Sequence, residues 1–183
     1  GVEESLPAEA AVVERLRREA LDRFRVWGYE QVDPPLVEFI ESLLISSGGD
    51  LDLQTVRVTD QVSGRMLGVR ADMTPQVARI DAHRLNRDAV TRLCYVGPVL
   101  HARPDCFGGT RVPLQLGAEL YGDATVASDI EVASLMLETL QSAGVQDLHF
   151  DLGHVAVFRQ MAAAAGLDEE QEAALFELLQ KKS

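Results

Sequence analysis

The sequence predicts an α+β domain in which a mainly antiparallel sheet is flanked by helices. The clearest strand pair lies between Thr91 and Gly122, where the apolar stretch 93–100 leads through a polar loop to alternating apolar and polar residues from Arg111 onward. A second strand pair is predicted over residues 54–69. Strand pairs joined by hairpins, with helical segments between them, favour an α+β fold over a parallel α/β fold.

Segments of helical periodicity precede, separate and follow these strand pairs. The pattern predicts helices over residues 8–27, 36–44, 128–142 and 154–165, and two more that begin near Pro75 and Asp168. Three of the helices are expected to end at a glycine, namely Gly28, Gly144 and Gly166. Thr74 is predicted as an N-cap with Pro75 as the first helical residue. Ser128 and Glu131 are predicted to form a capping box.

Three further segments complete the prediction. Residues 29–32 and 148–152 are expected to form short strands, and the small polar run 46–50 a mobile loop.

In the helix over 128–142, the apolar stripe that should face the core consists of Ile130, Ala133, Leu137 and Leu140.

Length and composition are those of an ordinary globular protein. The chain has 183 residues, 46% hydrophobic and 25% charged, and we expect one domain over residues 1–183. Its net charge of −12 argues against a nucleic-acid-binding surface, which needs a basic footprint. Without a long apolar run or a secretory signal, we expect no membrane span and a cytoplasmic location. Because the chain opens on Gly1 and stops at Ser183 after a helical pattern, we expect a segment whose domain is incomplete at its C-terminal end.

The alternating stretch 111–121 places an amide and a carboxylate on the same side of a strand. Its apolar residues would face a core, whereas Gln115 and Glu119 would share the opposite side with Gly117 between them. At about 3.3 Å per residue the two polar groups stand roughly 13 Å apart, and the bare glycine allows a close approach to the backbone. A small ligand with polar groups at both ends fits this arrangement. The alternative is a half-solvated strand face that binds nothing.

Generic motifs of catalysis and cofactor binding are missing from the sequence. It has no phosphate loop, dinucleotide fingerprint, zinc-ligand spacing or nucleophile elbow. The four histidines are scattered without a ligand cluster around them, so neither a metal site nor a cofactor is predicted. Asp72 lies just before a predicted helix, and its simplest role is to stabilise that helix end.

Three stretches carry a resemblance to a known family. They are VRADMTPQVAR (69–79), LCYVGPV (93–99) and QLGAELYG (115–122), which resemble the catalytic core of histidyl-tRNA synthetase, a class II synthetase fold. Residues 25–38 resemble the first motif of that family, which lies at its dimer interface. With DLGHVAVFR (151–159), the sequence is still more similar to the synthetase paralogues that act as regulatory subunits of ATP phosphoribosyltransferase in bacterial histidine biosynthesis. The third motif and the histidine-specific loop of the synthetase have no counterpart in this chain.

The positions that bind ATP in the synthetase differ here. The resemblance places His101-Ala102-Arg103 where the synthetase has an Arg-x-Glu that holds the α-phosphate and reads the adenine amine. A histidine carries only a partial charge near neutral pH, and Arg103 is a donor where the adenine amine needs an acceptor. The adenine-stacking ring falls at Pro113. The resemblance therefore implies that adenylate formation fails and that the chain has no catalytic residue.

The resemblance retains the half of the site that binds the amino acid. It implies that Asp72, Thr74 and Gln115 hold the ammonium end of L-histidine. Glu119 then accepts a hydrogen bond from the imidazole. Asp72 is one methylene shorter than the glutamate of the family.

Together these features imply a non-catalytic regulatory subunit that dimerises through residues 25–38 and binds the short-form catalytic subunit of ATP phosphoribosyltransferase. Such a subunit is required for activity and for feedback inhibition by histidine. Two alternatives stay open, namely a divergent histidyl-tRNA synthetase and a scaffold whose cleft is an empty relic.

Overall fold

The structure is a computed structural model that describes residues 4–43, 53–104 and 109–180. The chain divides into two compact units, residues 1–146 and residues 147–183. One domain over residues 1–183 therefore stays a prediction. The predicted loop 46–50 lies outside the described residues.

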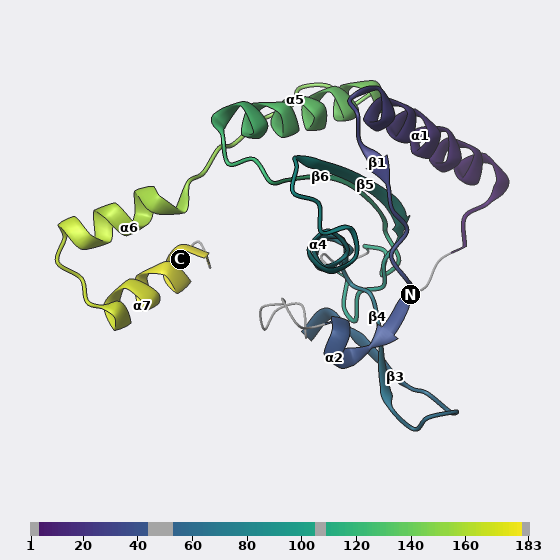
Figure 1. Cartoon of the computed structure of the whole chain (residues 1–183), viewed down its shortest axis with the longest axis horizontal. Coiled ribbons are helices and arrows are strands. Elements are labelled where there is room, and N and C mark those ends of the chain that lie inside the picture. The colour runs from purple at the N-terminus through teal and green to yellow at the C-terminus, as the bar shows by residue number, and fades with distance from the viewer. Residues whose placement is uncertain (1–3, 44–52, 105–108, 181–183) are drawn as a thin grey trace. The chain divides into compact units, whose positions relative to one another are not determined.

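A three-stranded sheet forms the centre of the first unit (Figure 1). Its strand order is β1 (Glu30–Gln31), β5 (Thr91–Pro98) and β6 (Leu114–Tyr121). The long pair predicted between Thr91 and Gly122 is confirmed, because β5 and β6 are antiparallel and place Tyr95 opposite Gly117. β1 adds a parallel strand on the other edge of β5. The predicted short strand over 29–32 is thus also present.

A second sheet of three short antiparallel strands has the order β2 (Val37–Phe39), β4 (Met66–Val69) and β3 (Val56–Thr59). The hairpin predicted over residues 54–69 is therefore confirmed. The helix predicted over 36–44 was wrong in its first part, since Val37–Phe39 pairs with β4 and only α2 (Ile40–Leu43) is helical. Pro34 and Pro35 hold the chain extended as it enters this segment, which favours continuation as a strand.

Helices cover both faces of the central sheet (Figure 1). α1 (Pro7–Val26) and α5 (Val126–Ser142) lie on one side and contribute to a buried cluster of Ala20, Phe24, Tyr29, Cys94 and Leu135. α4 (Thr74–Ile80), which continues into a π-helical turn over Asp81–Leu85, lies on the other side. Here the buried cluster consists of Met73, Val77, Leu93, Tyr95 and Val99. β5 is consequently buried on both faces.

Helix starts were the least accurate part of the sequence prediction. α5 begins at Val126 rather than Ser128, and the Ser128 hydroxyl donates to Asp123 at 2.8 Å instead of capping the helix. Glu131 is engaged in an ion pair with Arg92. The expected stripe was also wrong, because Ile130 is 60% exposed whereas the buried residues of this helix are Ser128, Leu135 and Thr139. Thr74 is the first residue of α4 and not its N-cap, which is Met73.

Within residues 147–180, the described part of the second unit, two helices are present, α6 (Val155–Ala164) and α7 (Glu169–Gln180). Both were predicted, and the rings of Phe158 and Phe176 join them with centroids 5.4 Å apart. Asp168 caps α7 by accepting a hydrogen bond from the Gln171 backbone N–H at 2.9 Å. The strand predicted over 148–152 was wrong, since these residues pair with no strand in the described part of the chain. Alternation without a neighbouring strand leaves the backbone donors and acceptors of a strand unsatisfied.

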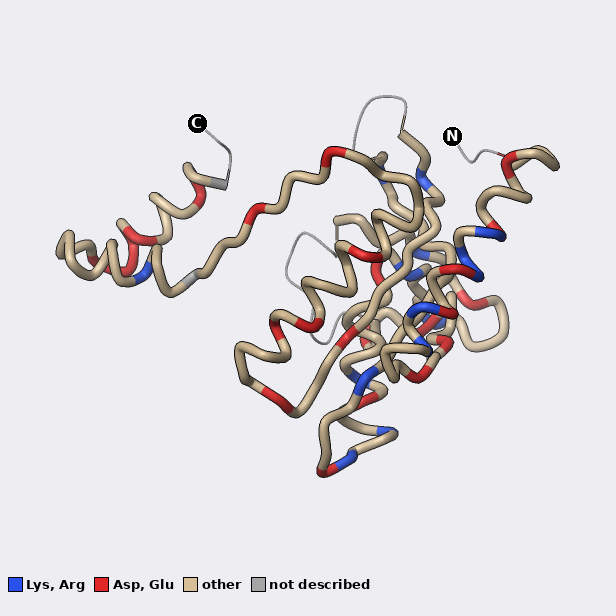
Figure 2. The backbone as a smooth tube through the Cα atoms, turned by 90° about the horizontal axis from the view of Figure 1, so that it is seen from above, with Lys and Arg blue, Asp and Glu red and all other residues tan. Residues whose placement is uncertain are grey.

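Acidic and basic side chains are interspersed along α1, whereas the described charged residues of the second unit are acidic except for Arg159 (Figure 2). Within residues 4–43, 53–104 and 109–180, no helix has the length and apolar character that crossing a membrane requires. The same residues include no group of three or more His, Cys, Asp or Glu side chains placed to hold a metal ion.

Candidate functional site

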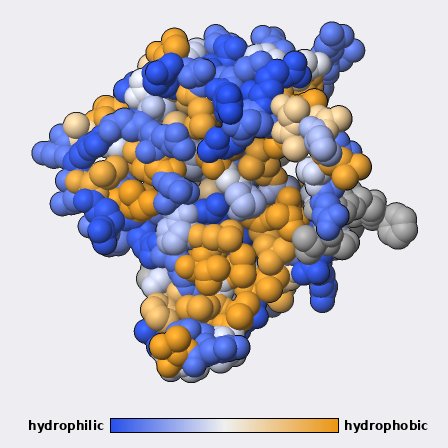
Figure 3. Space-filling model, turned by 90° about the vertical axis from the view of Figure 1, so that its right-hand side faces the viewer, coloured by the Kyte–Doolittle hydropathy of each residue, from blue (hydrophilic) through white to orange (hydrophobic). Residues whose placement is uncertain are grey.

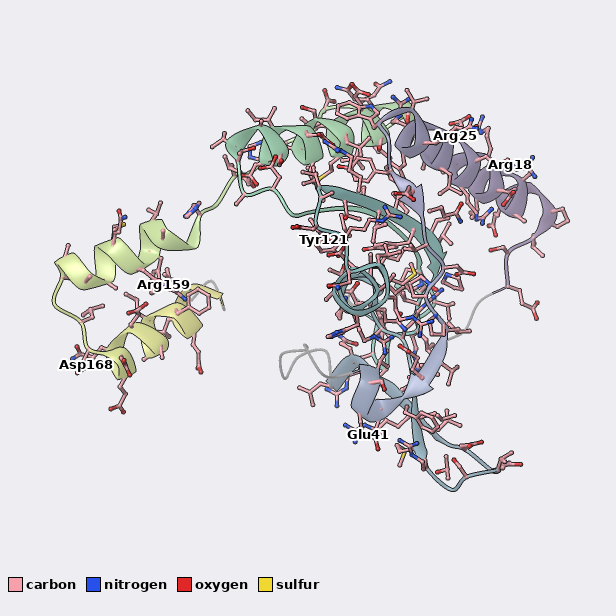
Figure 4. The ribbon with its side chains drawn as sticks, viewed as in Figure 1. Arg18, Arg25, Glu41, Tyr121, Arg159 and Asp168 are labelled. Carbon is pink, nitrogen blue, oxygen red and sulfur yellow. The ribbon has the colours of Figure 1, made fainter. Side chains whose placement is uncertain are left out.

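The four residues predicted to bind a ligand come together between α4 and β6. Asp72 and Thr74 lie where the chain enters α4, and Gln115 and Glu119 project from the side of β6 that faces this helix. Tyr121, labelled in Figure 4, projects from the same side of the strand. The predicted sharing of one strand face by Gln115 and Glu119 is confirmed.

The opposite side of β6 is only partly the core face that the alternation predicted. Ala118 packs against the cluster formed by α1 and α5. Leu114 and Leu116, however, are 38% and 40% exposed. β6 is the edge strand of its sheet in the described residues. The cluster formed by α1 and α5 packs against β6 at Ala118. The prediction of a core face was therefore wrong for the outer end of the strand.

Asp72 and Gln115 form one end of the candidate site. The Gln115 side-chain amide donates to Asp72 Oδ1 at 2.6 Å, and the Thr74 backbone N–H donates to the same oxygen at 2.9 Å. The amide oxygen of Gln115 accepts from the Met73 backbone N–H at 2.9 Å. The helix-end role expected for Asp72 is thus present. Because both bonds use Oδ1, the other carboxylate oxygen stays available to a ligand with an N–H group.

Glu119 and Thr74 form the other end, and Tyr95 joins them. The Tyr95 hydroxyl donates to Glu119 Oε1 at 3.1 Å and lies 2.9 Å from Thr74 Oγ1. Tyr95 was not among the site residues predicted from the sequence. The signal that could have found it is the register of the strand pair, which sets this aromatic residue directly opposite Gly117 on the face that carries Gln115 and Glu119.

The cluster is rich in acceptors and negatively charged. Burial raises the pKa of Glu119 above its usual range, and the charge of Asp72 acts in the same direction, while hydrogen bonds from Tyr95 and Thr74 oppose the shift. No Lys or Arg in the described ranges forms an ion pair with either carboxylate. Two carboxylates without a cationic partner favour a small ligand that carries an ammonium group and N–H donors.

The raised pKa of Glu119 predicts a pH-dependent stability difference. An acid whose pKa is raised on folding lowers stability as pH rises through that pKa, because the folded state disfavours the charged form. Glu119→Gln should therefore be more stable than the parent chain at pH 7, by less than about 1 kcal/mol because the group is partly solvated. The advantage should vanish near pH 4, where the carboxyl is protonated in both states. Urea unfolding at several pH values measures this, and a difference that is independent of pH would contradict it.

Arg70 fixes the segment that carries Asp72. Its guanidinium is buried, at 3% exposure for the residue, and donates to the backbone carbonyls of Pro98, at 3.0 Å, and Pro34. Gly97 leaves the space for it, since a Cβ there would lie 2.5 Å from Arg70 Nη2. Arg70 therefore ties the chain before β2 to the end of β5. The position of Asp72 depends on this connection.

His101, Arg103 and Pro113 stand at the positions that the resemblance relates to ATP binding, and His101 and Pro113 make hydrogen bonds within the chain. The His101 ring lies against the backbone of the Asp72 segment, with Nε2 3.1 Å from the Ala71 carbonyl oxygen. The His101 carbonyl accepts from the Arg111 side chain at 2.9 Å. Arg103 is exposed, and the Pro113 carbonyl accepts from the Val99 backbone N–H at 3.1 Å. His101 is thus directed toward the protein backbone.

The fold and this arrangement define a class of protein. The sheet with helices on both faces is the core of a class II aminoacyl-tRNA synthetase-like fold. A crystal structure from Bacillus halodurans C, described as an ATP phosphoribosyltransferase regulatory subunit/histidyl-tRNA synthetase, superimposes with a TM-score of 0.89 at 30% identity. The comparison covers 100% of this chain and 47% of that one.

Sequence comparison gives the family. The family model described as Histidyl-tRNA synthetase matches residues 1–183, and the chain belongs to this family. Curated relatives named ATP phosphoribosyltransferase regulatory subunit are 58% identical in Thioalkalivibrio sulfidiphilus and 59% identical in Ectopseudomonas mendocina, each over all 183 residues. Both comparisons cover 46% of the relative, so the chain spans about half the length of the curated relatives it matches.

Proposed function

We propose that this chain is the histidine-binding part of a non-catalytic regulatory subunit of ATP phosphoribosyltransferase, required for activity and for feedback inhibition by histidine. The names of relatives that match the whole chain at 58–59% identity support the assignment to a regulatory subunit. The observation that carries the assignment of a ligand is the assembled cluster between α4 and β6, with two carboxylates that form no ion pair with a cation of the described residues.

L-Histidine matches the chemistry of the two ends of the cluster. Its ammonium group would bind the end formed by Asp72, Thr74 and Gln115, where the side chains are already oriented by hydrogen bonds. Its imidazole N–H would donate to Glu119, whose carboxylate is held by Tyr95. A site whose side chains are fixed before the ligand arrives binds with a smaller loss of entropy.

The same subunit would lack synthetase activity. Activation of histidine needs a cation at the α-phosphate of ATP, and the corresponding position is occupied by His101, whose ring lies against the Ala71 carbonyl. Arg103 would present donors to the adenine amine instead of an acceptor. The regulatory role therefore needs no catalytic residue in this chain. The free energy of histidine binding would instead change the activity of the catalytic subunit.

Two protein partners belong to the proposal, a second copy of the subunit and the short-form catalytic subunit. Residues 25–38 would form the contact between the two copies, and they include the exposed apolar side chains of Val26, Leu36 and Val37. Figure 3 shows an exposed apolar area in the lower half of the molecule. β2, β3 and β4 lie at the same height in Figure 1. An exposed apolar area of this kind is typical of a protein interface.

The experiment mixes the full gene product that carries this chain with the short-form catalytic subunit from the same source. ATP phosphoribosyl transfer is measured with and without L-histidine, and the catalytic subunit alone serves as the reference. We expect transfer only in the mixture and its suppression by histidine. Histidine-dependent ATP–pyrophosphate exchange without any effect on transfer would instead support a divergent synthetase. An effect on transfer without any response to histidine would support a scaffold with an empty cleft.

A further inference from the structure

Tyr95 occupies the middle of the strand face between Gln115 and Glu119. The residue is 3% exposed, and its ring lies directly over Gly117, the residue opposite it in β6. A Cβ at Gly117 would stand 2.4 Å from both Cζ and the hydroxyl oxygen of Tyr95, far inside van der Waals contact. Only glycine at position 117 leaves the ring in this place. The space that the sequence suggested for a ligand is thus partly filled by Tyr95.

The hydroxyl of Tyr95 connects the two halves of the cluster. It donates to Glu119 Oε1 at 3.1 Å and lies 2.9 Å from Thr74 Oγ1, and Thr74 hydrogen-bonds Glu119 as well. The Glu119 carboxylate is therefore held by the protein. A carboxylate has about four lone-pair sites, so it can still accept a hydrogen bond from a ligand N–H.

We propose that Tyr95 is a positioning residue of the histidine site, and that Gly117 is glycine because the Tyr95 ring must lie over it. Tyr95 holds the Glu119 carboxylate so that it meets the imidazole N–H, and it links that end of the site to Thr74 at the ammonium end. This inference rests on the proposed binding of histidine and extends it to two residues, Tyr95 and Gly117. Tyr95 acts through Glu119 and Thr74.

The role predicts a change in the pH dependence of binding. Three titratable groups face Glu119, namely Asp72 before α4, Tyr95 on β5 and Tyr121 further along β6. Burial and Asp72 raise the pKa of Glu119, and the hydrogen bond from Tyr95 lowers it. Removing the hydroxyl should raise this pKa further, so the loss of binding on acidification should begin at a higher pH. A residue that only fills the core would weaken binding equally at every pH.

The test is calorimetric titration of L-histidine into the full gene product at several pH values. Tyr95→Phe keeps the ring and removes the hydroxyl, and we expect about tenfold weaker binding, which is 1.4 kcal/mol, with the acid limb displaced to higher pH. The matched control is Tyr29→Phe, because the Tyr29 hydroxyl donates to Glu131 at 3.1 Å on the opposite face of the sheet. This control should leave both the affinity and the acid limb unchanged.

A second variant tests the glycine. Gly117→Ala must displace the ring, so it should reproduce the loss seen with Tyr95→Phe, and the two changes together should cost little more than either alone. Should Tyr95→Phe fail to fold, Gly117→Ala provides the measurement. Wild-type affinity and pH dependence in Tyr95→Phe, with binding lost in Glu119→Gln, would overturn the inference and leave the proposed function standing. If the wild-type protein binds no histidine, both fail together.

Discussion

Replacing Arg70 by methionine is expected to lower the free energy of unfolding by about 2–4 kcal/mol. The guanidinium donates to the carbonyls of Pro34 and Pro98 in a buried position, and each carbonyl left without a donor costs about 1–3 kcal/mol. Methionine fills part of the volume but supplies no donor. The measurement is urea unfolding followed by circular dichroism, compared at equal m-values.

Arg18→Met is the matched control for this prediction. Arg18 is exposed, and its ion pair is with Glu14 on the same helix, so its replacement should change stability by less than about 0.5 kcal/mol. Equal shifts in the two variants would show that the carbonyl contacts of Arg70 contribute nothing beyond the loss of an ordinary surface charge. The prediction would then be wrong.

Glu119→Gln is expected to remove most of the response to histidine. The variant keeps the size of the side chain and its contact with Tyr95 but loses the charge that accepts the imidazole N–H. Removing the charged member of a buried hydrogen-bonded pair costs about 2–5 kcal/mol, so the histidine concentration for half-inhibition of transfer should rise by about 30-fold or more. Each variant is compared with its own uninhibited rate in the reconstituted complex.

Glu131→Gln provides the comparison on the opposite face of the sheet. Glu131 accepts from Tyr29 and forms a two-point ion pair with Arg92 at 2.7 and 2.8 Å. Its replacement should lower thermal stability without changing half-inhibition by histidine. If Glu119→Gln also prevents assembly with the catalytic subunit, Glu119 is structural and the proposed role is wrong. If both glutamate variants shift half-inhibition equally, the effect is one of general destabilisation.

The sequence predicted the elements whose signals are local and strong. The alternation after Arg111 defined β6, and Gly28, Gly144 and Gly166 end their helices with positive φ angles as expected. The failures have tertiary causes. Residues 148–152 alternate like a strand but have no partner strand in the described residues, and Val37–Phe39 is drawn into pairing with β4. Pairing between distant segments cannot be read from the periodicity of either one.

The candidate site was predicted in part. Alternation alone placed Gln115 and Glu119 on one face of the strand. Asp72 and Thr74 were predicted only from the resemblance to the family. Asp72 and Gln115 are 43 positions apart in the sequence, and no local pattern links residues so far apart. Tyr95 was missed because a buried aromatic residue in a central strand reads as core. Its second role depends on the glycine opposite it, which the strand register reveals.

The most direct test of histidine binding at this cluster is calorimetric titration of L-histidine into the full gene product near pH 7.5, without the catalytic subunit. We predict saturable binding of one histidine per subunit, lost in Glu119→Gln and retained in Glu131→Gln. Binding that survives in Glu119→Gln would place the histidine site elsewhere in the protein. Absence of binding by the wild-type protein would show that the cluster between α4 and β6 is not a histidine site.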